Sequence, residues 1–362
     1  MKKNRSLALL SAVLCLSLLT GCGAKPAPAA SAPAASVPAA SAPAASSPAD
    51  SAPASSTPAE PADYTDLVLD TSDDAGKLTV RYLAMKATYV ADGDKINVGD
   101  CSVYTSPEGL VMMVDCSNPA SFPEIDAQLQ AMGVEEIDIF VMSHPHADHI
   151  GCFAELAEHY PIHQLYKNEQ EYTSGTYTRA MAAAEEYDIP VTVLHEGDTF
   201  SFGDEVEVTV FGPTDKMEQS ITAMVDTTNN GSLALRIAYG ESSFWTAGDT
   251  YVPGEQAIVA AYGDAIQSDV IKMNHHGYET SNNKDYVEAL APKVAVSMHE
   301  SMTSKTVALR HSTRGAETFY TCMDGTVRVS TTGDGTYDVQ TQLVRTQTVY
   351  GEPAADGHYV IQ

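Results

Sequence analysis

Residues 143–151 read Ser-His-Pro-His-Ala-Asp-His-Ile-Gly, so four groups that can bind a metal ion lie within six residues. Imidazole nitrogens and carboxylate oxygens bind zinc at about 2.0–2.2 Å. The apolar run 137–142 directly before them predicts a buried strand, and the four groups should lie together where it ends. The pattern predicts a metal-dependent hydrolase. The four groups are the side chains of His144, His146, Asp148 and His149.

The alternation of these donors suits two metal ions. We expect His144 and His146 at one ion, and Asp148 and His149 at the other. Two ions roughly 3.5–4 Å apart can activate a water as hydroxide and stabilise both the attacking and the leaving oxygen. We therefore expect two Zn²⁺ ions, although one ion, or Mn²⁺ or Fe in place of zinc, also suits these ligands.

Residues 144–149 match the pattern HxHxDH, which resembles the signature of the metallo-β-lactamase superfamily. The resemblance extends over roughly residues 78–335. It implies an α+β fold, a four-layer αββα sandwich that carries the metal ions at one edge. The mixture of hairpin strands and helical segments along the chain favours the same class.

The resemblance also implies two later metal motifs. The strand-like run 244–249 ends in Gly-Asp, so Asp249 is the expected ligand that bridges the two ions. The run 270–277 ends in His-His-Gly. We favour His276 as the ligand and His275 as a contact to anionic oxygens of the substrate, but the sequence allows the reverse. The catalytic side chains expected from the resemblance are Asp148, Asp249 and His275.

One ligand of many superfamily members has no clear counterpart. They supply a further histidine between the first cluster and the bridging aspartate, in a Gly-x-His setting. The candidates here lack that setting, so the first ion would rely on His144, His146, Asp249 and water. Two histidines after the last motif could line the pocket, but a position at the surface is favoured. The three candidates are His159, His163 and His195, and the two later histidines are His299 and His311.

Residues 229–236 and 274–277 indicate a branch of the superfamily. They resemble the hydrolase domain of competence-type DNA-uptake proteins, and phosphorylcholine esterases of cell-wall teichoic acids are similar. This resemblance implies hydrolysis of a phosphoester or phosphodiester. Nuclease-type or lactam and lactone hydrolysis by the same fold are alternatives. So is a surface lipoprotein that binds a ligand without turnover.

The formal charge of −28 limits the partners of this chain. A strongly acidic protein repels polyanions, and tight nucleic-acid binding needs clustered Lys and Arg. We therefore expect a small-molecule or cell-wall phosphoester as substrate and no tight binding of nucleic acid.

The first 62 residues predict an anchor outside the cytoplasm. Residues 1–21 have the basic start and short apolar run of a signal peptide. They end in Leu-Leu-Thr-Gly before Cys22, which resembles the lipobox of bacterial lipoproteins and implies lipidation of Cys22. Residues 22–62 are rich in Pro, Ala and Ser and cannot form a core. We expect a membrane-anchored lipoprotein with a spacer.

The remaining chain is expected to form one hydrolase domain, 63–345, followed by a tail, 346–362, without a clear element. A hairpin signal at 106–109 separates Cys101 from Cys116, so a disulfide between these two cysteines is one possibility in a compartment where disulfides persist. The predicted strands are 78–83, 98–104, 110–115, 137–142, 191–194, 205–211, 232–239, 243–247, 270–273, 294–297 and 326–330. The predicted helices are 121–132, 150–158, 177–187, 256–262 and 283–290.

Overall fold

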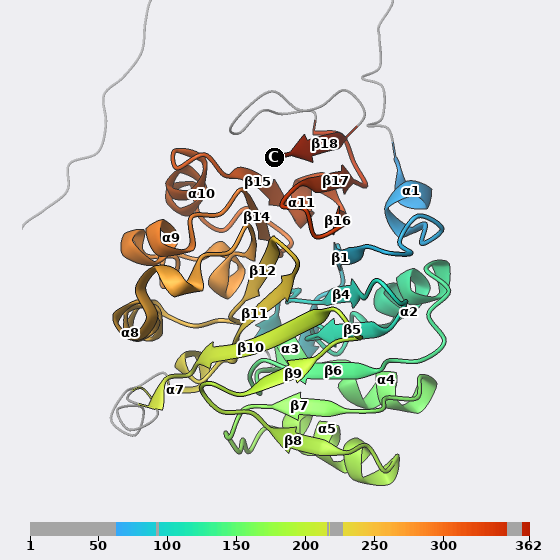
Figure 1. Ribbon diagram of the computed structural model, residues 1–362. Coiled ribbons are helices and arrows are strands. Elements are labelled where there is room, and N and C mark those ends of the chain that lie inside the picture. The colour runs from blue at the N-terminus through green and yellow to red at the C-terminus, as the bar shows by residue number, and fades with distance from the viewer. Residues whose placement is uncertain (1–62, 92–93, 216, 218–226, 346–356) are drawn as a thin grey trace, which may run out of the picture. The chain divides into compact units, whose positions relative to one another are not determined.

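Two β-sheets packed face to face form the centre of the fold in the computed structural model of this protein (Figure 1). The structure describes residues 63–91, 94–215, 217, 227–345 and 357–362. The predicted signal peptide, Cys22 and the Pro/Ala/Ser-rich spacer lie outside these residues. Within the described part, every helix is too short or too polar to cross a membrane.

The first sheet has nine strands in the order β18-β17-β16-β1-β4-β5-β6-β7-β8. Its pairs are antiparallel from β18 to β5 and parallel from β5 to β8. The strands are β1 (Leu78–Tyr82), β4 (Ser102–Thr105), β5 (Val111–Val114), β6 (Ile139–Met142), β7 (Leu165–Lys167), β8 (Val191–Val193), β16 (Val327–Thr331), β17 (Tyr337–Thr341) and β18 (His358–Ile361).

The second sheet has seven strands in the order β15-β14-β13-β12-β11-β10-β9. Strands β12 to β15 are parallel to one another, so their carboxyl ends meet at one edge. The strands are β9 (Thr199–Ser201), β10 (Val206–Gly212), β11 (Ala234–Tyr239), β12 (Ser242–Thr246), β13 (Val270–Lys272), β14 (Val294–Ser297) and β15 (Glu317–Tyr320). A separate hairpin joins β2 (Tyr89–Ala91) to β3 (Asp94–Ile96).

Helices cover the outer face of each sheet (Figure 1). The first sheet packs against α2 (Phe122–Ala131), α4 (Phe153–His159) and α5 (Gly175–Glu186). The second packs against α8 (Val252–Tyr262), α9 (Lys284–Leu290) and α10 (Lys305–Ser312). The predicted αββα sandwich is confirmed. The shorter helices are α1 (Thr65–Leu69), α3 (Ala147–Ile150), α7 (Thr227–Asn230), α11 (Thr321–Asp324), η1 (Gly263–Ile266) and η2 (Asn274–Gly277).

Strand β6 shows why an unbroken apolar run suits this fold. Side chains alternate along a strand, so a strand in a central layer needs apolar side chains on both of its faces. Ile139 and Val141 pack between the sheets, whereas Phe140 and Met142 pack beneath the helices. The predicted metal motif begins directly after Met142, so a strand buried on both faces supports it.

Three expectations about the chain differ from the structure. Residues 358–361 form β18 and pair with β17, so the predicted tail contains a strand of the first sheet. Cys101 and Cys116 are buried free thiols. The register pairs Ser102 with Val114, which sets Cys101 opposite Asp115 rather than Cys116, so the suggested disulfide is wrong. The strands that the sequence analysis missed are β2, β3, β7, β9, β15, β17 and β18.

Candidate metal centre

The predicted motifs meet where several strands end. The segment after β6 carries His144 and His146 and leads into α3, which carries Asp148 and His149. The segment after β12 carries Asp249, and η2 directly after β13 carries His275 and His276. The edges of the two sheets therefore bring together three sequence segments that lie far apart along the chain.

Four of these side chains form a tight group. His149 Nε2 lies 3.2 Å from Asp249 Oδ2. His276 Nε2 lies 3.4 Å from the same oxygen and 3.5 Å from Asp148 Oδ2. The edges of a tetrahedral zinc site measure about 3.3–3.6 Å when its ligands lie at about 2.0–2.2 Å. The spacing of these atoms therefore fits a metal ion between them.

Carboxylates behind the rings orient both histidines. His149 Nδ1 lies 2.7 Å from Asp115 Oδ2, and His276 Nδ1 lies 3.0 Å from Asp100 Oδ1. Such contacts leave Nε2 of each ring facing the centre. Both Nε2 atoms are buried and have no hydrogen-bond partner among the described residues, which is costly for a polar atom unless a metal ion binds it.

Asp100 is a functional residue that the sequence analysis missed. One ligand atom from each of Asp100, His149, Asp249 and His276 lies within 4.8 Å of the others, and all four residues are buried. Asp100 contacts the Nδ1 side of His276, however, whereas Asp148 lies on the Nε2 side. This geometry favours Asp100 as the outer partner of His276 and Asp148 as the ligand.

Charge holds the group together. Burial opposes the charged forms, but the attraction between Asp249 and the two histidines outweighs it. This attraction keeps the pKa of the Asp249 carboxyl well below its ordinary value. It also raises the pKa of His149 and of His276 well above theirs. A metal ion that binds here must therefore displace protons from these rings.

His144 and His146 form the second half of the site. His144 Nε2 lies 3.1 Å from His146 Nδ1 and 4.0 Å from Asp249 Oδ2. Burial lowers the pKa of His144 well below its ordinary value, so its ring is neutral, as a ligand must be. Asp249 Oδ2 thus lies near His144 as well as near His149 and His276, and its role as a bridge stays a prediction.

Two glycines allow the segments to approach so closely. A Cβ atom at Gly99 would lie 1.6 Å from the carbonyl oxygen of Asp148, so only glycine lets residues 99–100 pass beneath the histidine motif. Gly248 has φ +48°, and a Cβ there would lie 2.7 Å from Ser143 Oγ. Both glycines precede an aspartate of the site.

The segment 274–283 is held in an unusual conformation. His275 and His276 have φ of 48° and 52°, a region that costs free energy for residues other than glycine. Buried Glu255 on α8 secures this segment. Its carboxylate accepts hydrogen bonds from the side chains of Asn274 and Asn283 and from the backbone N–H groups of Asn282 and Asn283.

His275 and His276 differ in their surroundings. The side chain of His276 is 3% exposed and meets two carboxylates through Nε2. The side chain of His275 is 19% exposed and lies 3.7 Å from Asp249 alone. Both rings line a cavity of about 390 Å³ beside the centre. The deeper burial and the two carboxylate contacts favour His276 as the ligand.

The remaining histidines named from the sequence fall into two groups. His159, His163 and His195 are exposed and lie apart from the centre, so none replaces the absent third-motif ligand. Ser232 Oγ accepts a hydrogen bond from Asp249 N at 3.1 Å, and Asn230 Oδ1 accepts one from Gly254 N in the first turn of α8. The surface role expected for the two later histidines is wrong, because His299 lines the 390 Å³ cavity and His311 is buried in α10.

The charged residues that the sequence analysis missed could have been recognised from their positions in predicted strands. Asp100, Asp115 and Lys272 each lie within or at the end of an apolar run, and all three are buried. Charged residues are rarely buried unless they are paired. A charge inside a strand predicted to be buried therefore indicates a partner close by, although the sequence does not say which one.

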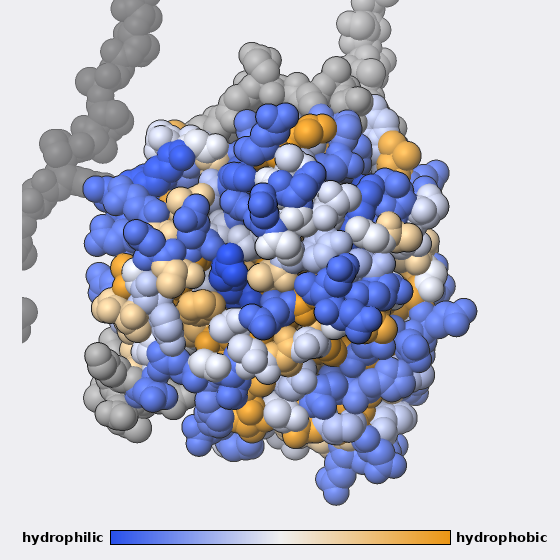
Figure 2. Space-filling model, viewed as in Figure 1, coloured by the Kyte–Doolittle hydropathy of each residue, from blue (hydrophilic) through white to orange (hydrophobic). Residues whose placement is uncertain are grey.

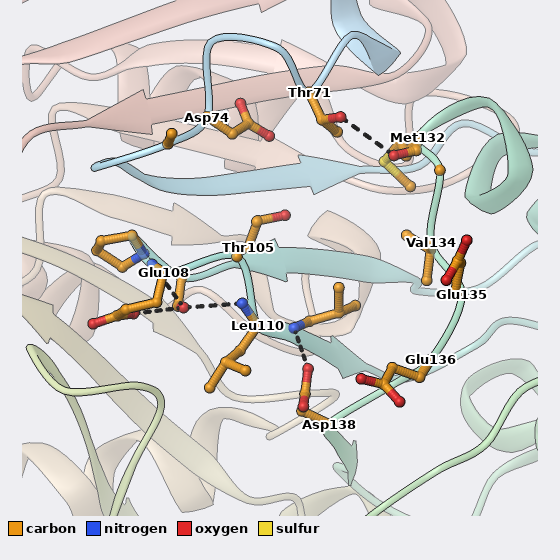
Figure 3. Close-up of a pocket in the computed structure, with 16 residues that line it drawn as sticks. Thr71, Asp74, Thr105, Glu108, Leu110, Met132, Val134, Glu135, Glu136 and Asp138 are labelled. Atoms are coloured by element: carbon orange, nitrogen blue, oxygen red, sulfur yellow. Dashed lines mark hydrogen bonds between the residues drawn. The ribbon is translucent and has the colours of Figure 1, made fainter.

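A separate cavity of about 450 Å³ lies at the other end of β4 and β5, around their connecting turn (Figure 3). Several acidic side chains line it, and Asp138 there accepts a hydrogen bond from Val111 N at 2.8 Å. None of the predicted metal ligands lies in its wall. The metal centre and its 390 Å³ cavity are therefore the candidate active site.

This chain belongs to the metallo-β-lactamase superfamily, a superfamily of metal-dependent hydrolases. The family model matches residues 96–299, which contain every residue of the candidate centre. The fold, the histidine motif and the grouping of Asp249 with His149 and His276 agree with this assignment.

Among curated proteins, the chain is similar to ComE operon protein 3 of Bacillus subtilis, at 27% identity over 46% of this chain. It is also similar to competence protein ComA of Neisseria gonorrhoeae, at 25% identity over 60% of this chain. The matches span only 20% and 29% of those two proteins. A UPF0173 metal-dependent hydrolase of Cupriavidus taiwanensis is 25% identical over 62% of this chain and 75% of its own length.

Among solved structures, the chain resembles one described as a diphosphatase from the PhnP family. The TM-score is 0.42 and the identity 13%, over 70% of this chain and 97% of the other. Another is CmlA, a diiron β-hydroxylase from Streptomyces venezuelae, with a TM-score of 0.44 and 12% identity over 67% of this chain and 52% of the other.

The first prediction concerns metal content. The purified domain should bind two divalent ions per chain. His149→Ala and Asp249→Ala should each lower the content to one ion or fewer, because each removes an atom from the group around Asp249 Oδ2. Elemental analysis measures the content. His163→Ala, which changes an exposed histidine paired with Glu136, is the matched control and should keep both ions. Unchanged content in His149→Ala would contradict the assignment.

The second prediction concerns Glu255. Glu255→Ala leaves buried donors of Asn274 and Asn282 without an acceptor, which costs about 1–3 kcal/mol for each unsatisfied group. The variant should unfold at a lower temperature, and its metal affinity should fall because residues 274–283 are no longer held. Thermal unfolding and metal titration measure the two effects. Wild-type values in both would show that Glu255 does not secure the segment.

Proposed function

We propose that this protein is a metal-dependent phosphoesterase or phosphodiesterase. The observation that carries the proposal is the convergence of His149, His276, Asp148 and Asp249 with His275 beside them. Divalent ions bound there would lower the pKa of a water to about 7 and stabilise negative charge on the reacting oxygens. The proposed metal ligands are His144, His146, Asp148, His149, Asp249 and His276, with Zn²⁺ as the expected ion.

The side chains around the ions have separate roles. Asp148 and Asp249 would accept hydrogen bonds from the attacking nucleophile and hold it in line with the substrate. His275 would contact an anionic oxygen of the substrate through Nε2, because its Nδ1 is engaged with Thr280 Oγ1 at 2.5 Å. A tetrahedral or trigonal phosphorus centre carries such oxygens throughout the reaction, which favours phosphoesters over lactams.

The surroundings favour a small or wall-bound substrate. The 390 Å³ cavity is lined by Asn97, Tyr278 and His299 and suits one substituent of a small phosphoester. The chain carries a charge of −28, and hydrophilic residues predominate on the face in Figure 2. A long nucleic acid would be repelled by such a surface, so tight nucleic-acid binding is not expected. The similarity to a protein named a metal-dependent hydrolase supports hydrolysis in general.

The proposed cellular location of the enzyme rests only on the sequence of residues 1–62. A signal peptide, lipidation of Cys22 and the Pro/Ala/Ser-rich spacer would attach the enzyme to the outer side of the cytoplasmic membrane. A spacer of this composition favours extended conformations. The domain could then act on substrates at some distance from the membrane.

The third prediction concerns the substrate class. The metal-loaded domain should hydrolyse chromogenic phosphodiesters or phosphomonoesters, and Asp249→Ala should lower kcat by at least about 100-fold because it removes the bridging carboxylate. A panel with phosphoesters, single-stranded DNA, a lactam and a lactone measures this. Turnover of the lactam or lactone alone would overturn the phosphoesterase. Two bound ions without turnover of any substrate would favour a binding protein.

The fourth prediction separates the two adjacent histidines. His275→Ala should keep both metal ions and lower kcat by roughly 100- to 1000-fold, the effect of removing one contact to a developing oxyanion. His276→Ala should lose a metal ion. Metal content and kinetics of the two variants, measured side by side, decide the assignment. Loss of an ion from His275→Ala and full content in His276→Ala would reverse the roles.

A further inference from the structure

Lys272 is a buried cation inside the metal centre. It is the last residue of β13, and its side chain is 1% exposed between the two sheets. Its Nζ forms an ion pair with Asp100 Oδ2 and donates to the carbonyl oxygen of Gly248 at 2.7 Å. Two buried carboxylates surround this side chain, Asp100 in the ion pair and Asp249 with its Oδ1 at 3.6 Å from Nζ.

The oxygen Oδ1 of Asp249 is buried without a hydrogen-bond partner among the described residues, and the ammonium of Lys272 lies near it. Its Nζ lies 3.6 Å from Asp249 Oδ1. The other oxygen, Oδ2, faces the histidines, with His149 Nε2 at 3.2 Å and His144 Nε2 at 4.0 Å. The two oxygens of Asp249 thus face different charges, the ammonium on one side and the metal ligands on the other.

The charges of the centre explain why a cation lies there. Asp100, Asp115 and Asp249 are buried, and Asp148 lies beside them. Unpaired buried carboxylates are very costly, so each needs a positive partner. With Lys272 charged, these four carboxylates leave three negative charges for metal ions to neutralise. Lys272 also ties Asp100 to the carbonyl of Gly248, which directly precedes Asp249.

We propose that Lys272 is a positioning residue that keeps Asp249 Oδ1 away from the metal ions, so that Asp249 bridges both ions through Oδ2 alone. Two features assist it. The ion pair with Asp100 fixes the ammonium, and the hydrogen bond to Gly248 fixes the backbone before Asp249. The inference rests on the two-ion centre of the proposed function and is independent of the substrate.

The test is Lys272→Met, which keeps most of the length of the side chain and removes the charge. Mn²⁺ titration followed by electron paramagnetic resonance measures both affinity and the exchange-coupled signal of two ions that share one bridging oxygen. The variant should bind the second ion roughly 10- to 100-fold more weakly and lose the coupled signal. Lys293→Met is the matched control, because Lys293 pairs with Asp269 away from the centre, and it should retain both.

A second variant keeps the test decisive if Lys272→Met does not fold. Lys272→Gln retains a donor for the Gly248 carbonyl but lacks the charge, and it should show the same loss. A coupled pair with wild-type affinity in either variant would overturn the proposal, and so would a single ion in the wild type at saturating Mn²⁺. The readout is metal binding, so inactivity on every phosphoester contradicts the proposed function and not this role of Lys272.

Discussion

Burying several carboxylates side by side costs free energy that positive charge and hydrogen-bond donors must offset, and the rest of this structure depends on that constraint. Asp100, Asp115 and Asp249 are almost completely buried. Their partners are the rings of His149 and His276 and the ammonium of Lys272. Protons on the two rings can supply this charge, and metal ions that displace those protons can supply more. The same electrostatic requirement thus stabilises the fold and creates affinity for divalent ions.

The two sheets make this arrangement possible. Parallel strands bring their carboxyl ends to one edge, where β12 and β13 present Asp249 and His276 to the histidine motif after β6. The backbone there is strained or closely packed at His275, His276 and Gly99. These segments are held in place by buried polar groups such as Glu255 rather than by the apolar core. A rigid sandwich therefore carries a site made of short, individually unfavourable segments.

Much of this could be predicted from the sequence, and the failures have physical causes. Local chemistry indicated His144, His146, Asp148 and His149. A nearly unbroken apolar run indicated β6, and the strand-like run 270–273 indicated β13. Asp100 and Lys272 were missed because each is explained by its ion pair with the other, 172 positions away along the chain. No local pattern in the sequence indicates such a pair. The strands β15 and β18 were missed because short edge strands carry little periodicity. The suggested disulfide failed on register, since one residue of shift turns a side chain to the other face of the sheet.

The central claim is that Asp249 Oδ2 joins two metal ions. Crystals of the domain grown with Zn²⁺ and measured at the zinc absorption edge test it most directly. If Asp249 Oδ2 joins two ions, two anomalous peaks should appear roughly 3.5–4 Å apart. One peak should lie among Asp148, His149 and His276 and the other beside His144 and His146, with Oδ2 of Asp249 between them. A single peak held by Asp100 in place of Asp148, or no peak at this edge of the sheets, would contradict the account.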